Sequence, residues 1–319
     1  MSQSVSDYLD RLTERSDLLW PLAPEVESLK ATPALQPMAD VRIITLCPYG
    51  TLLHIDQGEL VHLHPQSIRT QIALEKTIKE FNMWNSMSRK PGQPWEYMLQ
   101  QYTKLIDDRR MTGTRRKGDI PEIDSAAIWQ KIVERLQKNE YQYDVDAMGD
   151  AAELGAKIAY FFHASMQGVR ASAHAAETLL QLKNAGIRTG LLGDGQVFTV
   201  PQIFRALKKQ LPMESPGQVL SSECIAISTQ VGVRLPSPSL FEHARDLFSS
   251  LGFEPQQVLH VSHRHLGDLT EARKVGFRTA LYAADKQTCV VDKASLRDPN
   301  LRPDRLITDL RQLRDLLQL

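Results

Sequence analysis

The chain has 319 residues, enough for one large domain with an insertion or for two domains. Its 38 basic and 38 acidic residues balance, so no net field would hold it on nucleic acid. Three widely spaced cysteines do not form a disulfide framework. No run approaches the ~18 apolar residues of a membrane span, and the polar N-terminus does not resemble a signal peptide. We therefore expect a cytoplasmic protein that binds neither nucleic acid nor a membrane.

The first forty residues and the segment after them differ in pattern. Residues 1–40 begin with an amphipathic stretch and then become rich in proline, so we expect an N-terminal arm of helix and loop. Residues 41–46 are apolar and rich in β-branched side chains, which predicts a buried strand. This strand runs into the turn sequence CPYGTLL, which begins at Cys47.

Residues 62–168 carry helical periodicity and no strand signal. Apolar side chains recur at helical spacing over residues 74–81, over residues 128–136 behind a capping Asp124, and over residues 154–162. We expect this stretch to form an all-helical cap that is inserted into the remaining domain.

From residue 180 onward, short apolar runs alternate with helical patterns. This alternation predicts a Rossmann-like α/β core, with a parallel sheet covered on both faces, made of residues 41–61 and 169–319. The expected strands are 186–192, 223–228, 257–262 and 277–283, and the expected helices are 200–210, 238–251 and 266–275.

Four segments, in order, are similar to the motifs of one superfamily. They are LCPYGTLL, TGLLGDGQVFT, VGVRLPSPSLFEHA and VLHVSHRHLGDLTEARKVGFRTALY. In this order and spacing they resemble the haloacid dehalogenase-like (HAD-like) hydrolases that carry a helical cap after the first motif. The resemblance covers nearly all of residues 41–317. It implies an α/β core in which the motifs meet at the carboxyl ends of neighbouring strands.

The resemblance also implies a chemistry. In this superfamily the leading aspartate of the first motif is the nucleophile, and in phosphatases a second aspartate two residues on is the acid/base. Carboxylates of the first and fourth motifs hold Mg²⁺, while a serine or threonine and a lysine in the middle motifs bind the transferring group.

Almost every position that carries this chemistry is altered, although framework residues such as Gly50 and Thr51 remain. Magnesium-dependent phosphoryl transfer is therefore not supported, and we expect no cofactor. The corresponding positions are Cys47 for the nucleophile, Tyr49 for the acid/base, Gly193 and Asp194 in the second motif, Arg234 and Leu235 in the third, and His263 and Asp268 in the fourth. Of these, only Asp268 keeps the expected side chain.

Two roles stay open for Cys47. A thiolate paired with a histidine could attack a substrate, and adjacent strands would bring Cys47 near His263 or His265. Alternatively, Cys47 is a small buried residue that fills the space of a lost carboxylate, as free cysteines often do. A cysteine-phosphatase loop is absent because Leu53 lies where that loop requires an arginine.

A zinc site is the other chemical possibility. Cys47, His263 and His265, with Asp268 or His54, are candidate ligands, and the pair His62 and His64 is a weaker signal. The plainer expectations are that isolated histidines are hydrogen-bonded, that Asp268 lies at a helix N-terminus, and that Asp194 belongs to a turn.

Two features of the predicted cap could bind ligands. The basic run over residues 109–117 could capture an anion or an acidic partner, although Asp107, Asp108 and Asp119 favour a solvated loop. Aromatic side chains, which we expect to form the cap core rather than a ligand platform, are Trp84, Trp95, Tyr97 and Trp129.

Two functions remain open. The first is a relative without catalysis that binds a small anionic molecule or a protein partner. The second is an active phosphatase- or dehalogenase-like hydrolase that acts on a small anionic substrate through Cys47 or a surviving acid. Because several losses would have to be compensated at once, the residues favour the first.

Overall fold

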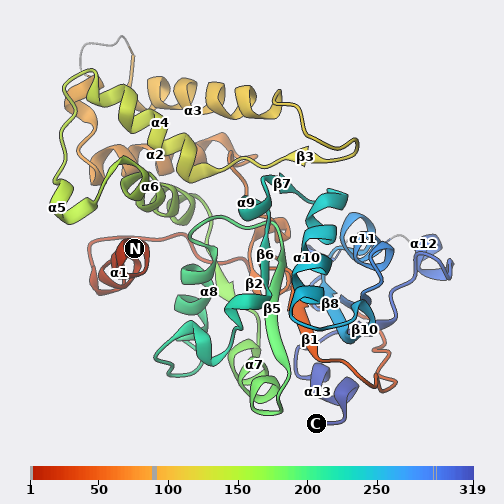
Figure 1. Ribbon diagram of the computed structural model, residues 1–319. Helices are drawn as coiled ribbons and strands as arrows, with labels where there is room; N and C mark the ends of the chain where they lie inside the picture. Colours follow the sequence, from red (N-terminus) through yellow and green to blue (C-terminus); the bar gives the residue numbers. More distant parts are fainter. Residues whose placement is uncertain (1–2, 88–91, 290, 292) are drawn as a thin grey trace.

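Figure 1 shows the computed structural model, which describes residues 3–87, 92–289, 291 and 293–319. A six-stranded sheet, parallel throughout, lies at the centre, in the order β10-β9-β8-β1-β5-β6. Its strands are β1 (Ile43–Leu46), β5 (Arg188–Gly193), β6 (Ile225–Ile227), β8 (Val258–Ser262), β9 (Arg278–Tyr282) and β10 (Arg305–Ile307). The first five match the predicted segments, although β5 extends one residue beyond 186–192. Strand β10 was not predicted, because three residues give no usable periodicity.

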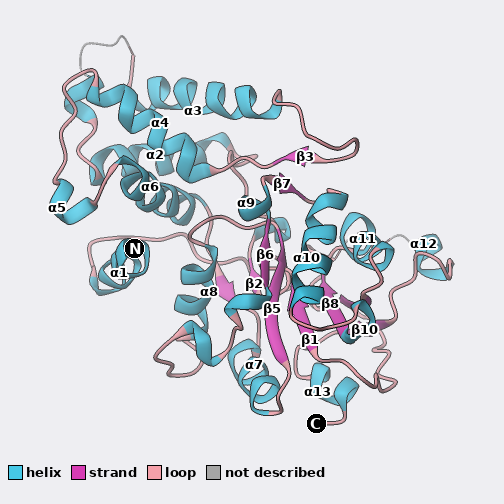
Figure 2. Ribbon diagram, in the orientation of Figure 1, coloured by secondary structure: helices cyan, strands magenta, loops and turns pink. Residues whose placement is uncertain are grey.

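Helices cover both faces of this sheet, as predicted (Figure 2). Successive strand residues point to opposite faces, so Ile44 packs in one apolar cluster and Ile43 in another. The first cluster includes side chains of α7 (Ala175–Asn184), α8 (Thr199–Leu207) and α13 (Gln312–Leu317), and the second includes those of α10 (Pro238–Ser250) and α11 (Thr270–Lys274). The shorter helices of the core are α9 (Ser228–Val231) and α12 (Lys293–Arg297).

One predicted helix begins later than the sequence indicated. The pattern predicted helix from residue 266, whereas α11 begins at Thr270. Leu266 has extended backbone angles and Gly267 has φ of 81°, so the chain makes a loop at these two residues before the helix starts. Asp268 directly follows these two residues.

The inserted region is helical apart from one short strand. Between β2 (Leu53–His54) and β4 (Arg170–Ala171), which pair antiparallel, helices pack around a large apolar cluster that includes Trp129 and Phe162. They are α2 (Ser67–Glu80), α3 (Pro94–Arg110), α4 (Ser125–Gln137), α5 (Val145–Met148) and α6 (Ala151–Met166). Asp124 caps α4 as predicted, with its carboxylate accepting from Ala127 N at 3.1 Å.

The expectation of no strand in the insertion was wrong. Strand β3 (Ile120–Pro121) pairs antiparallel with β7 (Val233–Arg234), which belongs to the third motif. Two residues, one of them a proline, give no alternating pattern that could have signalled the pairing. The exact domain boundaries stay a prediction. No described helix combines the length and the apolarity that crossing a membrane requires.

The N-terminal arm consists of helix and loop, as expected. Helix α1 (Gln3–Glu14) packs against α6 and α8. The chain then runs past the core in extended form, with isolated bridges from Ser28 to Asp285 and from Ala34 to Leu306. These pairings join the arm to the segments around β9 and β10, at the far end of the sequence (Figure 1).

The close packing of β5 on the segment before β6 gives a test of the fold. A Cβ at Gly190 would lie 2.0 Å from the backbone oxygen of Cys224. Since backbone cannot move aside cheaply, Gly190→Ala should lower the free energy of unfolding by about 2 kcal/mol. Gly113→Ala is the control, because a Cβ there meets no atom within 4 Å. Urea unfolding curves of equal midpoint for the two variants would contradict this packing.

Candidate functional site

The first and fourth motifs meet at the carboxyl ends of β1 and β8, as predicted. These strands are adjacent and parallel, with Leu46 in register with Val261, and Cys47 N donates to Val261 O at 3.0 Å. Strand β5 lies on the other side of β1 and ends at Gly193. The three strand ends therefore bring Cys47, Gly193 and the segment after Val261 to one edge of the sheet.

The Cys47 thiol is buried under apolar atoms, with 3% of the residue exposed. Its Sγ donates to the backbone oxygen of Tyr49 at 3.4 Å. A Cβ at Gly193 would lie 3.2 Å from this sulfur and 3.6 Å from a methyl carbon of Leu235, so Gly193 packs against the thiol and Leu235 packs beside Gly193. The positions that the resemblance assigns to a hydroxyl and an ammonium group are therefore occupied by a glycine and a leucine.

Burial holds the pKa of Cys47 well above its usual value, and the negative charge of Asp268 raises it further. The positive charge of Arg264 opposes part of this rise. Because the thiolate is the nucleophilic form of cysteine, a thiol held protonated is a poor nucleophile. The environment of Cys47 thus matches the structural role rather than the catalytic one.

The His263 ring lies against the first turn instead of the thiol. A Cβ at Gly50 would come within 2.3 Å of the ring, and one at Gly58 within 2.6 Å. Nε2 accepts from Arg264 Nε at 3.4 Å, so Nδ1 carries the proton and lies 3.3 Å from Thr51 Oγ1. Burial lowers the pKa of His263 to about 3, which keeps the ring neutral.

The other candidate histidines hold distant segments together. His265 Nε2 donates to Leu301 O at 2.8 Å, and His54 Nε2 donates to Pro24 O in the N-terminal arm at 2.9 Å. His64 Nδ1 accepts from Gln66 N at 3.0 Å. The His263 and His265 rings thus have other hydrogen-bond partners, which gives no support to the role of either as a base for Cys47.

The proposed zinc ligands do not converge. Within the part of the chain that the structure describes, no group of three or more His, Cys, Asp or Glu side chains could hold a metal ion. His62 lies beside His163 instead, with ring centroids 5.5 Å apart, and burial lowers the pKa of both.

Asp268 is fully buried and accepts hydrogen bonds on both oxygens. His260 Nε2 donates to Oδ1 at 2.9 Å, and the Ser262 hydroxyl donates to Oδ2. His260 Nδ1 accepts in turn from Thr45 Oγ1 on β1 at 2.9 Å. Asp268 thus anchors β8 to β1. Asp268 lies at a helix N-terminus, as expected, since α11 begins at Thr270, but its oxygens bond to strand residues.

The pKa of Asp268 reflects two opposing effects. Burial alone would raise it, but His260, Ser262 and Arg264 together favour the carboxylate and lower it. His260 and Ser262 were missed as partners in the sequence. A histidine at the centre of an otherwise apolar strand was the available signal, since a buried polar group needs a partner.

Arg264 is the central charge of the site. Its guanidinium contacts Glu59 at 2.7 Å and Asp194 at 3.6 Å. Asp194 also contacts Arg234 at 3.4 Å and accepts from Leu235 N at 2.7 Å. Burial raises the pKa of Asp194, and both arginines counteract that rise. Neither Arg264 nor Glu59 stood out in the sequence, because their pairing joins two motifs far apart in the chain.

A buried acid from the insertion completes the cluster. Glu122 follows β3, is 4% exposed, and accepts from Ile123 N at 2.8 Å and from Gln196 Nε2 at 3.2 Å. Burial, and then the charge of Asp194, raise its pKa to about 7. No sequence signal marked it, because its burial depends on the pairing of β3 with β7.

The basic run joins the insertion to the core. Arg109 Nε donates to Glu122 O at 2.7 Å, and Arg116 pairs with Glu242 on α10. Asp119 accepts from Ser239 N at 3.2 Å. The arginines that the sequence offered as anion ligands are thus partly engaged in contacts within the chain.

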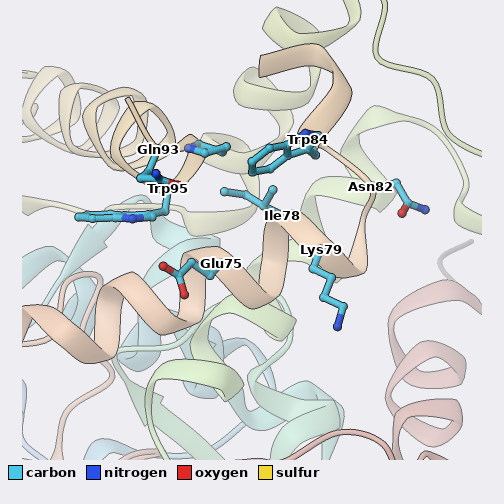
Figure 3. A pocket seen from close by; sticks show the side chains of 8 residues that line it. Glu75, Ile78, Lys79, Asn82, Trp84, Gln93 and Trp95 are labelled. Carbon is cyan, nitrogen blue, oxygen red and sulfur yellow. The ribbon is translucent and has the colours of Figure 1, made fainter. Parts of the chain in front are cut away.

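The aromatic residues of the insertion divide into two groups. Trp129 is fully buried, as expected. The expectation for Trp84 was wrong, because 54% of it is exposed. Figure 3 shows that Trp84 and Trp95 lie on either side of Ile78 in a cavity of about 450 Å³ on the surface of the inserted helices.

Comparison with known proteins adds one curated relative. Glyceraldehyde 3-phosphate phosphatase of Pyrococcus furiosus is 23% identical over 230 residues, which cover 67% of this chain and 89% of that protein. No family model matches the chain. This sequence similarity, together with the motifs on neighbouring strands, supports the resemblance of the chain to haloacid dehalogenase-like hydrolases.

Solved structures of HAD-like enzymes also align with most of the chain. A 2-haloacid dehalogenase from Pseudomonas syringae covers 87% of this chain and 98% of its own, at 16% identity and a TM-score of 0.48. A HAD phosphatase from Thermococcus onnurineus covers 87% and 98%, at 14% identity and a TM-score of 0.44.

The residues present do not fit the Mg²⁺ ion of HAD-like phosphatases. A carboxylate ligand is replaced by the Cys47 thiol, and the fourth motif presents His263 turned toward Thr51. Asp268 uses both oxygens within the protein, and the Arg264 guanidinium already neutralises the nearby acids. Magnesium requires oxygen ligands in near-octahedral geometry, so this donor set is unsuitable.

Replacing Asp268 tests its structural role. Asp268→Asn should lower the free energy of unfolding by roughly 2 kcal/mol at pH 7, since hydrogen bonds to a buried charged group are lost. The folded pKa of Asp268 is lowered, so its stabilisation is complete above the unfolded pKa of about 3.9 and disappears as the pH falls through the folded value. Urea unfolding at several pH values measures the difference. If the difference in unfolding free energy between Asp268→Asn and the unmodified chain did not change with pH, the structural role of the Asp268 carboxylate would be contradicted.

The state of Cys47 can be tested through thiol reactivity. All three cysteines are buried, and burial raises the pKa of each. The folded chain should therefore react with a thiol reagent at pH 7 much more slowly than after denaturation. Mass spectrometry of the modified peptides identifies the site. Fast modification of native Cys47, absent in Cys47→Ala, would reveal a thiolate.

Proposed function

We propose that this chain uses the HAD-like fold for binding and has lost the hydrolase reaction. The observation that carries the proposal is the buried Cys47 thiol, which packs against Gly193 and is 3% exposed. A hydrolase of this fold needs an ionised nucleophile that a substrate can reach. Cys47 is protonated because of burial, and it is covered by apolar atoms.

The acid/base position supports the same proposal. Tyr49 is buried, its hydroxyl donates to Gln202 Oε1 at 2.8 Å, and Thr199 Oγ1 lies 3.0 Å away. Burial raises the pKa of Tyr49 above its usual value. A general acid or base must reach the reacting group and have a pKa near the working pH. Tyr49 instead fixes the first turn against α8.

The chain also lacks free cationic side chains at the positions that would bind a transferring phosphoryl group. Leu235 supplies no charge, and Arg234 is paired with Asp194. Arg264 is shared between Asp194 and Glu59. An anionic substrate would have to break these pairs to gain a cation. The small anionic molecule or protein partner that we propose as ligand would therefore bind elsewhere on the chain.

A phosphatase reaction through another acid is the second candidate function. Its support is the similarity to a glyceraldehyde 3-phosphate phosphatase and the buried Glu122, whose pKa burial raises to about 7. A carboxyl group with this pKa suits general acid/base chemistry. The residue at the nucleophile position, Cys47, is buried and its pKa is raised, so this candidate is the weaker one.

A turnover assay separates the two candidates. The purified chain, incubated with p-nitrophenyl phosphate and Mg²⁺, should release no more nitrophenol than heat-inactivated protein, because its thiol is protonated and covered. The Pyrococcus furiosus phosphatase serves as a positive control. Activity that disappears in Cys47→Ala would overturn the proposal, and activity that disappears in Glu122→Gln alone would support the second candidate.

A further inference from the structure

A cavity of about 390 Å³ lies away from the motif residues, between the N-terminal arm and two helices. Residues 20–25 of the arm form one wall, the end of α6 and the segment after it form the second, and α8 forms the third. In Figure 1 the arm passes between the labels α6 and α8 at this place. The volume is that of a small-molecule site rather than a macromolecular groove.

Three cations line this cavity, from two different parts of the chain. They are Arg170, Arg205 and Lys209. The one acid in the lining, Glu25, is 95% exposed and lies 3.9 Å from Arg170, a distance at which a surface pair contributes little. The cavity is therefore positively charged, although the whole chain has no net charge.

The guanidinium of Arg205 has unused donors. It donates to the Tyr160 hydroxyl, but its Nε is buried and has no hydrogen-bond partner. Among the described residues, no carboxylate lies within 4 Å of Arg205 or of the Lys209 ammonium. A buried donor without a partner costs about 1–3 kcal/mol. The buried Nε is closed to a ligand, so an anion in the cavity would accept from the terminal nitrogens of the Arg205 guanidinium.

Apolar and aromatic groups form the rest of the lining. Trp20 packs edge-on against Phe161, with ring centroids 5.3 Å apart, and Val169 and Ala206 add apolar surface. The arm is fitted closely at this point, since a Cβ at Gly168 would lie 2.2 Å from the backbone of Leu22. The wall that carries Trp20 is thus held against the segment after α6.

We propose that this cavity binds a small organic anion, a carboxylate or a phosphate monoester carried on an apolar body. Arg205 and Lys209 contact the anionic group, and Trp20 contacts the body. None of the motif positions Cys47, Gly193 and Asp268 lines the cavity. Gln202 in its wall accepts from the Tyr49 hydroxyl. The proposal stands independently of whether the motif site is catalytic.

Calorimetric titration of the full chain tests this site with four probes. Phenyl phosphate and benzoate carry the two anionic groups, inorganic phosphate lacks the apolar body, and phenol lacks the charge. We expect at least one aromatic anion to bind with one-to-one stoichiometry and more tightly than phosphate or phenol. Whichever anion binds identifies the class. Failure of both aromatic anions to bind at millimolar concentration would overturn the proposal.

Matched variants locate the binding. Lys209→Gln and Arg205→Gln should each weaken it roughly tenfold, the effect of losing one charge-assisted hydrogen bond. Lys208→Gln is the control, because Lys208 lies outside the lining and its ammonium is above the Phe204 ring, 5.4 Å from the centroid. If Arg205→Gln does not fold, the affinity of Lys209→Gln still tests the proposal, because Lys209 is exposed. The proposal would be overturned if Lys209→Gln bound the anion as tightly as the unmodified chain, or if Lys208→Gln weakened binding as much as Lys209→Gln.

Discussion

The contact of the Arg264 guanidinium with Asp194 and Glu59 determines the character of the crevice. Asp194, whose side chain is mostly buried, needs a positive charge nearby, because unpaired buried charges are costly. In HAD-like phosphatases that charge is a magnesium ion. Here a side chain of the fourth motif itself provides it. The acids near the motif residues are thereby neutralised without any group from outside, and Arg264 also fixes the His263 ring.

The retained Asp268 and the altered residues at the other motif positions all stabilise the fold. Asp268 joins β8 to β1 through His260 and Thr45, so it stabilises the strands that would otherwise present the reacting groups. Gly193 packs against the thiol at the nucleophile position, and Leu235 packs beside Gly193. The turn glycine Gly50 is retained, and His263 packs on it. The fold is thus retained, while the polar side chains at the motif positions form hydrogen bonds and ion pairs within the chain.

The sheet and the meeting of the motifs could be predicted because they follow from local patterns. Apolar runs and β-branched residues mark β1, and parallel strands must share their carboxyl edge. The orientation of His263 could not be predicted, because it depends on the space above Gly50 and Gly58 in the folded chain. The pairs of Arg264 and the burial of Glu122 likewise depend on contacts between distant segments, which periodicity does not encode.

The most direct test of this account is a calorimetric titration of the purified chain with Mg²⁺. Because Arg264 supplies the positive charge and Asp268 uses both oxygens within the protein, we predict no saturable heat at millimolar Mg²⁺. Arg264→Ser, which removes the internal cation, is the informative companion variant. Stoichiometric Mg²⁺ binding by the unmodified chain, abolished in Asp268→Asn, would contradict the account.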